Sequence, residues 1–337
     1  MKKIVGSLLL IFLLLLACDS KDKIKFSKVR LKKQVSVFSD SSFFGRVSDV
    51  ILNNEHLLIT DLTQNRILLC DTSFNKAVSY GGTGEGPGEF KEVLRSYIKN
   101  NLVFLFDRYN GALSVFSLSG KFVKRITYPR RIASFGRFAM DDSLKIYIAD
   151  PDRDSSVVKL DTSGQIVRQF GSVFPGKNFR EKRARSEKHI LWSKDNQLIC
   201  ISLSEPHIEF YSTNGKKLQE FSLADSPYLT ERLAYVKEQY QQEPKKREST
   251  YLLFQDAYLV NNHLYLLYVD QDEQNRPKLD KILVYTVESN NLRFYKAIDL
   301  SNDRKGLWYD VIAVTSDEKM IYAFAGNLNE WRIFSIQ

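Results

Sequence analysis

The stretch LLITDLTQNRILLCD, residues 57–71, holds two short apolar segments joined by a polar turn at Gln64 and Asn65. The same arrangement recurs in LVFLFDRYNGALSVF, residues 102–116, and again at residues 146–161. Short apolar segments bounded by turn residues are typical of paired β-strands. A hairpin that returns at intervals along one chain indicates a repeat architecture, so the unit of this fold is a small β-sheet.

The spacing of the repeat predicts how many strands each unit holds. Equivalent points in the first three copies, at Asp61, Asp107 and Asp150, lie 46 and 43 residues apart. Looser copies follow at intervals of 52, 66 and 57 residues, at Ser202, Tyr268 and Ala325. A further strand candidate precedes each hairpin, and a fourth follows most of them, often after a glycine turn. This length suits a four-stranded propeller blade, and six units are present.

The two ends of the repeat region complete each other. The last unit has only three strand candidates, at about residues 311–315, 320–325 and 331–336, whereas a spare candidate covers residues 28–38. If the spare strand pairs with the last unit, the ring closes and no long sheet edge stays exposed. We therefore predict an all-β fold, a six-bladed β-propeller over residues 28–337 whose last blade is closed by the N-terminal strand. A β-sandwich, the alternative, does not explain a missing strand matched by a spare one.

One segment between the fourth and fifth units breaks the repeat. Ser226 and Pro227 form a helix start signal. An apolar stripe at helical spacing then runs toward a proline at position 244, through Leu229, Leu233, Val236 and Tyr240. These residues predict one short helical insertion between blades 4 and 5.

The N-terminus predicts export and a lipid anchor. Residues 1–17 combine two lysines with an apolar run that is too short to span a membrane, as in a secretory signal peptide. The sequence Leu15-Leu16-Ala17-Cys18 resembles the lipobox of bacterial lipoproteins. That resemblance implies cleavage before Cys18, acylation of Cys18, and a tether over residues 18–27. We expect a lipid-anchored protein of the cell envelope, in the outer rather than the inner membrane. The alternative is an ordinary cleaved signal in which this cysteine is incidental.

The other two cysteines, Cys70 and Cys200, lie within apolar strand candidates. Disulfides persist in an exported protein. However, the repeat places these two residues on different blades, and cysteine is among the most buried residue types. We predict two buried free thiols.

A glycine-rich segment, GGTGEGPGEF at residues 81–90, follows the fourth strand of the first unit. It resembles the loop that links blades in NHL-like and TolB-like six-bladed propeller lipoproteins, and residues 171–176 resemble a degraded copy. Glycines allow the positive φ angles that a return from an outer to an inner strand requires. Phosphate binding is the weaker interpretation, because no Gly-Lys-Ser or Gly-Lys-Thr sequence follows.

Charge in the loops suggests what the propeller binds. The net charge of +9 falls to 9 − 2 = +7 when Lys2 and Lys3 leave with the signal. Nucleic acid is not expected as a partner outside the cytoplasm. Loops that gather on one propeller face carry many basic residues and some aromatic ones, and an anionic glycan, peptide or envelope protein is the predicted partner. The candidate ligand-binding residues are Arg130, Arg131, Arg180, Arg183, Arg185, Trp192 and Trp308. Interspersed acidic residues favour the alternative of an unspecific charged surface.

An enzyme remains the alternative function. Some six-bladed propellers are calcium-dependent lactonases or esterases, and carboxylate and amide ligands for calcium could come from Asp49, Asn53, Asp141 and Asp310. The run from Asp150 to Asp154 also begins like a calcium loop, but Ser155 stands where such a loop needs glycine. The four histidines are scattered. We therefore predict no catalytic residue, no metal site and no cofactor, with calcium as the exception under the enzyme alternative.

Overall fold

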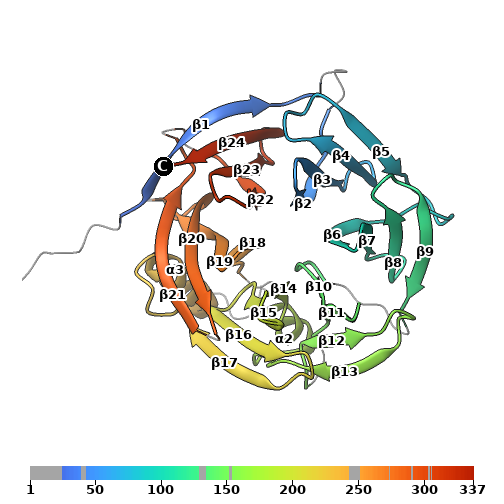
Figure 1. Ribbon diagram of the computed structural model, residues 1–337. Coiled ribbons are helices and arrows are strands. Elements are labelled where there is room, and N and C mark those ends of the chain that lie inside the picture. Colours follow the sequence, from blue (N-terminus) through green and yellow to red (C-terminus); the bar gives the residue numbers. More distant parts are fainter. Residues whose placement is uncertain are drawn as a thin grey trace, which may run out of the picture.

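Six blades surround a central axis in the computed structural model (Figure 1). It describes residues 25–38, 43–128, 134–151, 154–242, 251–272, 274–289, 291–302, 304 and 306–337. Within blades 1 to 5 the strands are antiparallel and run in sequence order from the axis to the perimeter (Figure 1). The predicted six-bladed propeller is therefore confirmed.

The strands of the first three blades follow the repeat read from the sequence. Blade 1 holds β2 (Val47–Asn53), β3 (His56–Asp61), β4 (Arg66–Asp71) and β5 (Ala77–Gly81). Blade 2 holds β6 (Val93–Lys99), β7 (Leu102–Asp107), β8 (Ala112–Ser117) and β9 (Phe122–Thr127). Blade 3 holds β10 (Ala139–Met140), β11 (Ile146–Ala149), β12 (Val157–Leu160) and β13 (Ile166–Phe170).

The last three blades have longer or less regular strands. Blade 4 holds β14 (Lys188–Trp192), β15 (Gln197–Ser202), β16 (His207–Ser212) and β17 (Lys217–Ser222). Blade 5 holds β18 (Phe254–Val260), β19 (His263–Gln271), β20 (Pro277–Glu288) and β21 (Asn291–Asp299). Blade 6 holds β22 (Tyr309–Val314), β23 (Met320–Ala325) and β24 (Glu330–Ile336).

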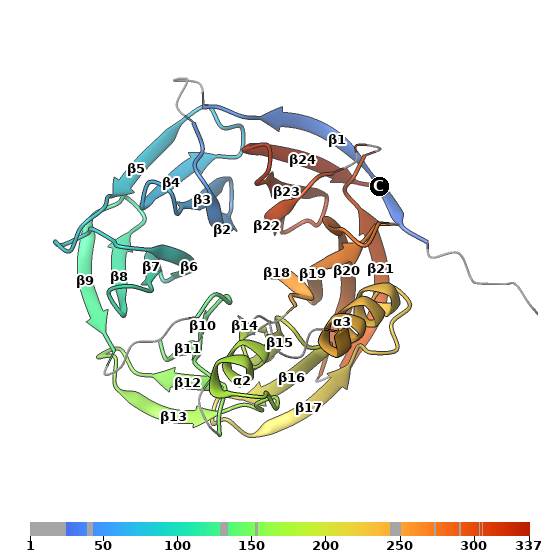
Figure 2. The ribbon, with the colours of Figure 1, turned by 180° about the vertical axis from the view of Figure 1, so that it is seen from behind.

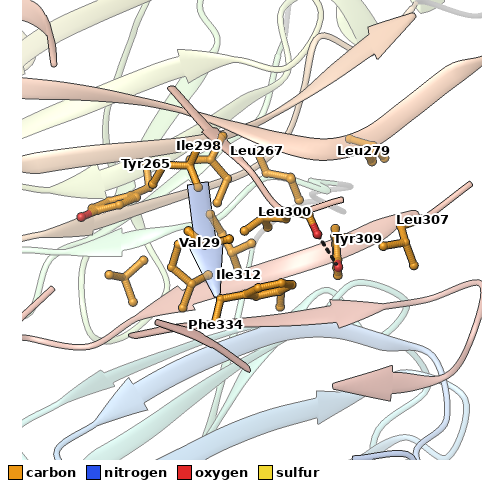
Figure 3. Packing of buried hydrophobic residues seen from close by; sticks show 14 of the residues in the cluster. Val29, Tyr265, Leu267, Leu279, Ile298, Leu300, Leu307, Tyr309, Ile312 and Phe334 are labelled. Carbon is orange, nitrogen blue, oxygen red and sulfur yellow. Dashed lines mark hydrogen bonds between the residues drawn. The ribbon is translucent and has the colours of Figure 1, made fainter. Parts of the chain in front are cut away.

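The N-terminal strand β1 (Ser27–Val35) closes the ring as predicted. It pairs antiparallel with β24, from Val29 opposite Ile336 to Val35 opposite Trp331. Its first two residues also pair in parallel with the end of β21, so blades 5 and 6 form one eight-stranded sheet. Figure 3 shows Val29 of β1 among buried side chains of both blades, including Ile298 and Phe334.

The hydrophobic core is divided among the six junctions between neighbouring blades. In β3, Leu57 and Ile59 pack toward blade 6, whereas Leu58 between them packs toward blade 2. Successive side chains of a strand point to opposite faces. Both faces of a blade are covered, and this is why the strands read as continuous apolar runs rather than as an apolar–polar alternation.

Aspartates that recur at the end of the second strand join two loops of the same blade. The carboxylate of Asp61 accepts hydrogen bonds from Gly45 N before β2 and from Gln64 N in the following turn, at 3.2 Å each. Asp107 does the same for the segment before β6, from Lys91 N at 3.1 Å. Asp150, the third copy, contacts the Arg183 guanidinium at 3.4 Å. The bonds of Asp61 and Asp107 fix the starts of β2 and β6, whereas Asp150 contacts the segment between blades 3 and 4.

The glycine-rich segment is a loop between blades 1 and 2. Gly81 has φ +94°, and a side chain there would collide with the Phe90 ring, which is fully buried at the blade junction. The loop binds its own backbone, through Phe90 N to Gly82 O at 2.7 Å and Gly84 N to Phe90 O at 2.9 Å. The structure agrees with the interblade interpretation.

Two helices interrupt the strands on one face of the ring, α2 (Phe179–Arg185) and α3 (Thr230–Gln242) (Figure 2). The prediction of α3 between blades 4 and 5 is confirmed. The expectation of only one helical insertion was wrong, because α2 lies between blades 3 and 4. Its sequence FREKRAR carries no apolar stripe, and its start is set by Asn178, whose side chain accepts from Glu181 N. Neither helix is long and apolar enough to cross a membrane, a finding limited to the described residues.

Cys70 and Cys200 are buried and free, as predicted. Burial raises the pKa of each thiol to about 12, so both stay protonated at neutral pH. They serve as small apolar core residues.

Candidate functional site: a pocket on the ring axis

A pocket of about 540 Å³ opens where the innermost strands begin, and all six blades contribute to it. This volume lies in the range of small-molecule sites. Apolar walls come from Leu62, Leu94, Phe135, Leu203 and Leu252. Charged side chains come from Arg46, Glu92, Arg95, Arg180, Arg183, Glu187 and Asp310. The pocket therefore combines an apolar interior with a surplus of arginine.

β-Bulges shape the pocket floor. The pairing of β2, β6, β18 and β22 shifts by one residue near each strand start. The unpaired residues at these four shifts, Ser48, Leu94, Gln255 and Asp310, all line the pocket. A bulge bends its strand and re-aims side chains. Here it turns one residue per strand toward the pocket. The next residue of β2, β6 and β18 is a buried charged one, whereas Val311 of β22 packs in the core between blades 6 and 1.

Below the pocket, four charged residues from four blades form what we term the channel cluster, namely Asp49, Arg95, Arg137 and Asp256. Arg137 binds both carboxylate oxygens of Asp256, from Nε and Nη2 at 2.8 Å each. Its Nη1 lies 2.7 Å from Asp49 Oδ1. Arg95 Nη1 lies 3.5 Å from an oxygen of each aspartate. Two positive and two negative groups thus compensate each other.

Burial acts against the charges of Asp256 and Arg137, but the partner charges outweigh it. The arginines hold the pKa of the buried Asp256 carboxyl below its ordinary value. The two aspartates in turn raise the pKa of the Arg137 guanidinium despite its burial. A bidentate arginine–carboxylate pair is the strongest form of such a contact. Asp256 and Arg137 therefore stay ionised, and the ion pairs of the cluster tie blades 1, 2, 3 and 5 together.

His189 completes the channel from blade 4 and is neutral. Its Nδ1 accepts a hydrogen bond from Arg137 N at 3.1 Å, which places the ring proton on Nε2. Burial, aided by the nearby Arg95 charge, lowers the pKa of His189 to about 3. It therefore adds no charge to the channel at neutral pH.

Two pocket carboxyls have raised pKa values. Burial raises the pKa of Glu187 to about 7, although Glu187 Oε1 accepts hydrogen bonds from Ser134 Oγ at 2.7 Å and Phe135 N at 2.9 Å. Burial likewise raises the pKa of Asp310, against the lowering effect of the Arg46 charge. Because Glu187 is partly protonated near neutral pH, it offsets less of the arginine charge than a fully ionised carboxylate would.

Helix α2 brings two of the predicted ligand-binding residues to the pocket. Arg180 and Arg183 both line it, and Arg183 contacts Asp150 at 3.4 Å. Arg185 points elsewhere, because its Nε bonds Glu205 Oε1 at 2.6 Å. Arg130 and Arg131 lie outside the described residues.

The two predicted tryptophans do not line the pocket. Trp192 was expected near the start of an innermost strand, but it is the last residue of β14 and stacks on Tyr147 at 6.5 Å. The strand begins four residues earlier, at Lys188, a buried lysine that was interpreted as a loop residue. Trp308 donates from Nε1 to Asp310 Oδ1 at 3.1 Å and so borders a pocket residue. The aromatic ring that does line the pocket is Phe135, with Arg108 4.5 Å from its centroid.

The four candidate calcium ligands of the enzyme alternative, three aspartates and Asn53, do not form one group. Asp49 belongs to the channel cluster, and Asn53 ends β2 at the other end of that strand. Asp141 accepts from Tyr147 Oη at 2.8 Å, within blade 3. Of the calcium-like run, Asp152 lies outside the described residues. The one group with metal-ligand spacing in the described chain is His207, Glu209 and Glu220, where Lys217 lies 3.2 Å from Glu209 and competes for its carboxylate.

Sequence reasoning missed Arg46, Phe135, Glu187 and the channel arginines Arg95 and Arg137. A signal was present, since Arg95 and Asp256 interrupt otherwise apolar innermost strands. A charge inside a buried strand needs a partner. The sequence does not reveal that the partners are each other.

Solved structures with low sequence identity share this fold. A DUF4221 family member from Bacteroides vulgatus is 11% identical with a TM-score of 0.58, covering 93% of this chain and 99% of its own. A putative exported protein from Bacteroides fragilis is 13% identical with a TM-score of 0.57, and the match covers 95% of this chain and 97% of that protein. Virginiamycin B lyase from Staphylococcus aureus is 11% identical with a TM-score of 0.54, and the match covers 92% of this chain and 100% of the lyase. These likenesses concern the fold alone.

A search of curated proteins finds no match. The model of one family matches residues 37–323, which is most of the chain and includes the pocket. With its blades, its closure and this match, the chain belongs to DUF5128, a family of 6-bladed β-propellers.

Proposed function

We propose that this protein is a lipid-anchored binding module of the cell envelope that holds an anionic ligand in the axial pocket. The observation that supports this most is the convergence of Arg46, Arg180 and Arg183 on one pocket. Two of the pocket carboxyls have raised pKa values, and the third, Glu92, is already bound by Arg108 at 2.5 and 2.7 Å. A positive potential inside a concave, partly apolar site favours anions.

The pocket walls narrow the ligand chemistry. Leucines on four sides and the Phe135 ring, which is 52% exposed, offer contact to an apolar or ring-shaped part of a ligand. The arginines offer paired N–H donors to a carboxylate, sulfate or phosphate. An acidic sugar fits both features, as does a peptide that carries an acidic group. This ligand chemistry is consistent with the anionic glycan or peptide expected from the loop charges. The aromatic ring proposed to contact the ligand is now Phe135 rather than Trp192 or Trp308.

The site favours binding over calcium-dependent hydrolysis. A calcium ion on the propeller axis needs free oxygen ligands. Asp49 and Asp256 instead engage two guanidinium groups there, at 2.7 to 3.5 Å. Because the guanidinium groups of Arg95 and Arg137 already occupy both carboxylates, neither aspartate is free to bind a cation there. Calcium-dependent lactone cleavage by the purified protein would reverse this ranking.

The envelope location rests on the lipobox-like sequence at Leu15–Cys18. Two or more acyl chains anchor a protein stably, because each buried methylene contributes about 0.8 kcal/mol. We place the anchor in the outer membrane. Metabolic labelling with a palmitate analogue tests this, since the label should enter the wild-type chain and be absent after Cys18→Ser. Fractionation of the labelled cells would then identify the membrane.

Charge reversal tests the pocket. The double variant Arg180→Glu and Arg183→Glu should lose retention on an acidic-glycan or phosphate resin at low salt, because both residues line the pocket. The matched control is Arg168→Glu with Lys216→Glu, which changes the net charge equally on the perimeter of blades 3 and 4. Equal retention of the wild type and the pocket variant would refute the proposal. Equal losses in both variants would show unspecific charge binding.

A further inference from the structure

The first described residues are fixed at one place on the perimeter. Tyr228 Oη donates to Lys25 O at 3.1 Å, and the Tyr228 ring meets the Phe26 ring edge-on at 5.5 Å. On its other side Tyr228 stacks on Phe294 of β21 at 5.1 Å. Lys281 Nζ lies 4.8 Å from the Phe26 centroid. The chain therefore enters the propeller beside β21, held by an aromatic cluster.

β1 and β21 form adjoining parts of the perimeter there (Figures 1 and 2). Their exposed side chains, which we term the β1–β21 rim, include five basic and two aromatic residues. These are Lys28, Arg30, Lys32, Lys33, Arg293, Phe294 and Tyr295. Phe294 is 42% exposed and Tyr295 55% exposed, although both are large and apolar.

The other outermost strands do not share this composition. β5 exposes no charged side chain, and β9 and β13 expose one basic residue each, Lys124 and Arg168. β17 exposes Lys217, but Glu220 lies 2.6 Å from it and neutralises it. Within the rim strands the one acid, Asp299, is half-buried and accepts from Ser301 N at 2.8 Å. The positive charge of the outermost strands is thus concentrated on β1 and β21, the two strands beside which the chain enters.

We propose that the β1–β21 rim lies on an anionic membrane surface. Lysine and arginine side chains near a membrane attract acidic lipid headgroups, and exposed aromatic rings favour the headgroup level. Cys18 lies seven residues before Lys25. A chain of that length spans at most about 25 Å when extended. A lipid on Cys18 would therefore keep this edge of the ring within reach of the bilayer.

The orientation of the ring follows from this contact. A propeller that rests on its perimeter presents its axis parallel to the membrane, so the pocket opens sideways into the envelope space. The orientation rests on the proposed anchor, whereas the affinity of the rim for acidic lipid does not. The two can therefore be tested separately.

Vesicle sedimentation measures the rim affinity directly. The chain from Asp19 onward, which contains the whole closed ring, is mixed at low salt with vesicles of phosphatidylcholine alone or with phosphatidylglycerol added. We expect binding to the acidic vesicles only, and weakening as salt is raised. Lys28→Glu with Arg30→Glu and Arg293→Glu should lower the partition coefficient about tenfold or more, because each basic residue near the surface contributes to attraction.

A matched control separates the rim from net charge. Lys124→Glu with Arg168→Glu and Lys216→Glu makes the same change in charge on blades 2 to 4 and should keep vesicle binding. Phe294→Ala with Tyr295→Ala should weaken it at unchanged charge. The proposal is wrong if the wild type leaves acidic vesicles unbound, or if the rim and control variants lose binding equally. The pocket variant Arg180→Glu, Arg183→Glu should still bind vesicles, so a failure of the rim and a failure of the pocket give different results.

Discussion

The channel cluster and the β1–β21 rim use the same kind of residue in opposite ways. In the channel, Arg137 has a side chain that is 8% exposed, and both of its carboxylate partners are fully buried. At the rim, Arg30 and Arg293 are exposed on strands with one half-buried acid. The channel arginine binds carboxylates inside the protein, whereas the rim arginines expose their charge to solvent.

The difference teaches where charge holds the fold and where it remains available for a partner. A buried ion pair is costly to break, because the remaining partner cannot regain its hydration. An exposed charge contributes little to stability, because water and salt screen it. The pocket lies between these extremes, with arginines at its surface and a buried carboxyl, Glu187, in its wall. We therefore expect substitutions to change the free energy of unfolding most in the channel cluster, less in the pocket and least at the β1–β21 rim.

The largest effect is expected in the channel. Arg137→Met would leave Asp49 and Asp256 buried with Arg95, at 3.5 Å, as their remaining positively charged partner among the described residues. We expect a loss of about 3–5 kcal/mol in the free energy of unfolding. Urea denaturation followed by tryptophan fluorescence measures this. A loss below about 1 kcal/mol would show that the cluster does not hold the blades together.

An intermediate effect that depends on pH is expected in the pocket wall. The pKa of Glu187 is about 7 in the folded protein, against an ordinary value of 4.5, so the folded state binds its proton more tightly. The stabilisation from this group is complete below the unfolded pKa and is lost as pH rises through 7. Glu187→Gln mimics the protonated form. It should match the wild type at pH 4 and exceed it by up to about 3 kcal/mol at pH 8.

The difference in the free energy of unfolding between the wild type and Glu187→Gln, measured at several pH values, isolates the contribution of Glu187. His189 titrates in the opposite sense, since its lowered pKa costs stability in acid. That contribution is common to both proteins and cancels in the difference. A difference that stays constant from pH 4 to pH 8 would contradict the assignment.

The smallest effect on stability is expected at the rim. Arg30→Ala and Arg293→Ala should each change the free energy of unfolding by no more than about 0.5 kcal/mol, because both side chains are exposed. The same urea titrations at low and high salt provide the measurement. A loss above about 1 kcal/mol would mean that the rim charges serve the fold, which would remove the contrast with the channel.

Much of the architecture could be predicted because the strands of each blade are neighbours in the sequence. Strands such as Leu57–Asp61 pair with neighbours a few residues away, and Asp61 caps its own turn. Helix α2 escaped prediction because a short, highly charged helix is set by one capping residue, Asn178, rather than by an apolar stripe. The strand start at Lys188 was missed because this lysine is buried against Glu209 and reads as a loop residue in the sequence.

The site was less predictable because its parts meet only when the ring is closed. Of the residues chosen for loop charge, Arg180 and Arg183 lie at the pocket, and their role in binding stays a prediction. Trp192 was assigned to the wrong end of its strand. Phe135 and Glu187 gave no local signal, since their roles depend on the direction of the loops before β10 and β14.

By itself, the sequence determined the number of blades, the closing strand β1 and the free thiols, because apolar period and turn residues act over short distances. The tertiary structure alone decided which charges face one another. Arg137 and Asp256 are 119 residues apart in the chain, and Arg95 and Asp256 are 161 apart. No local pattern encodes such contacts, because they arise from ring closure and from the bulges that aim the innermost strands at the axis.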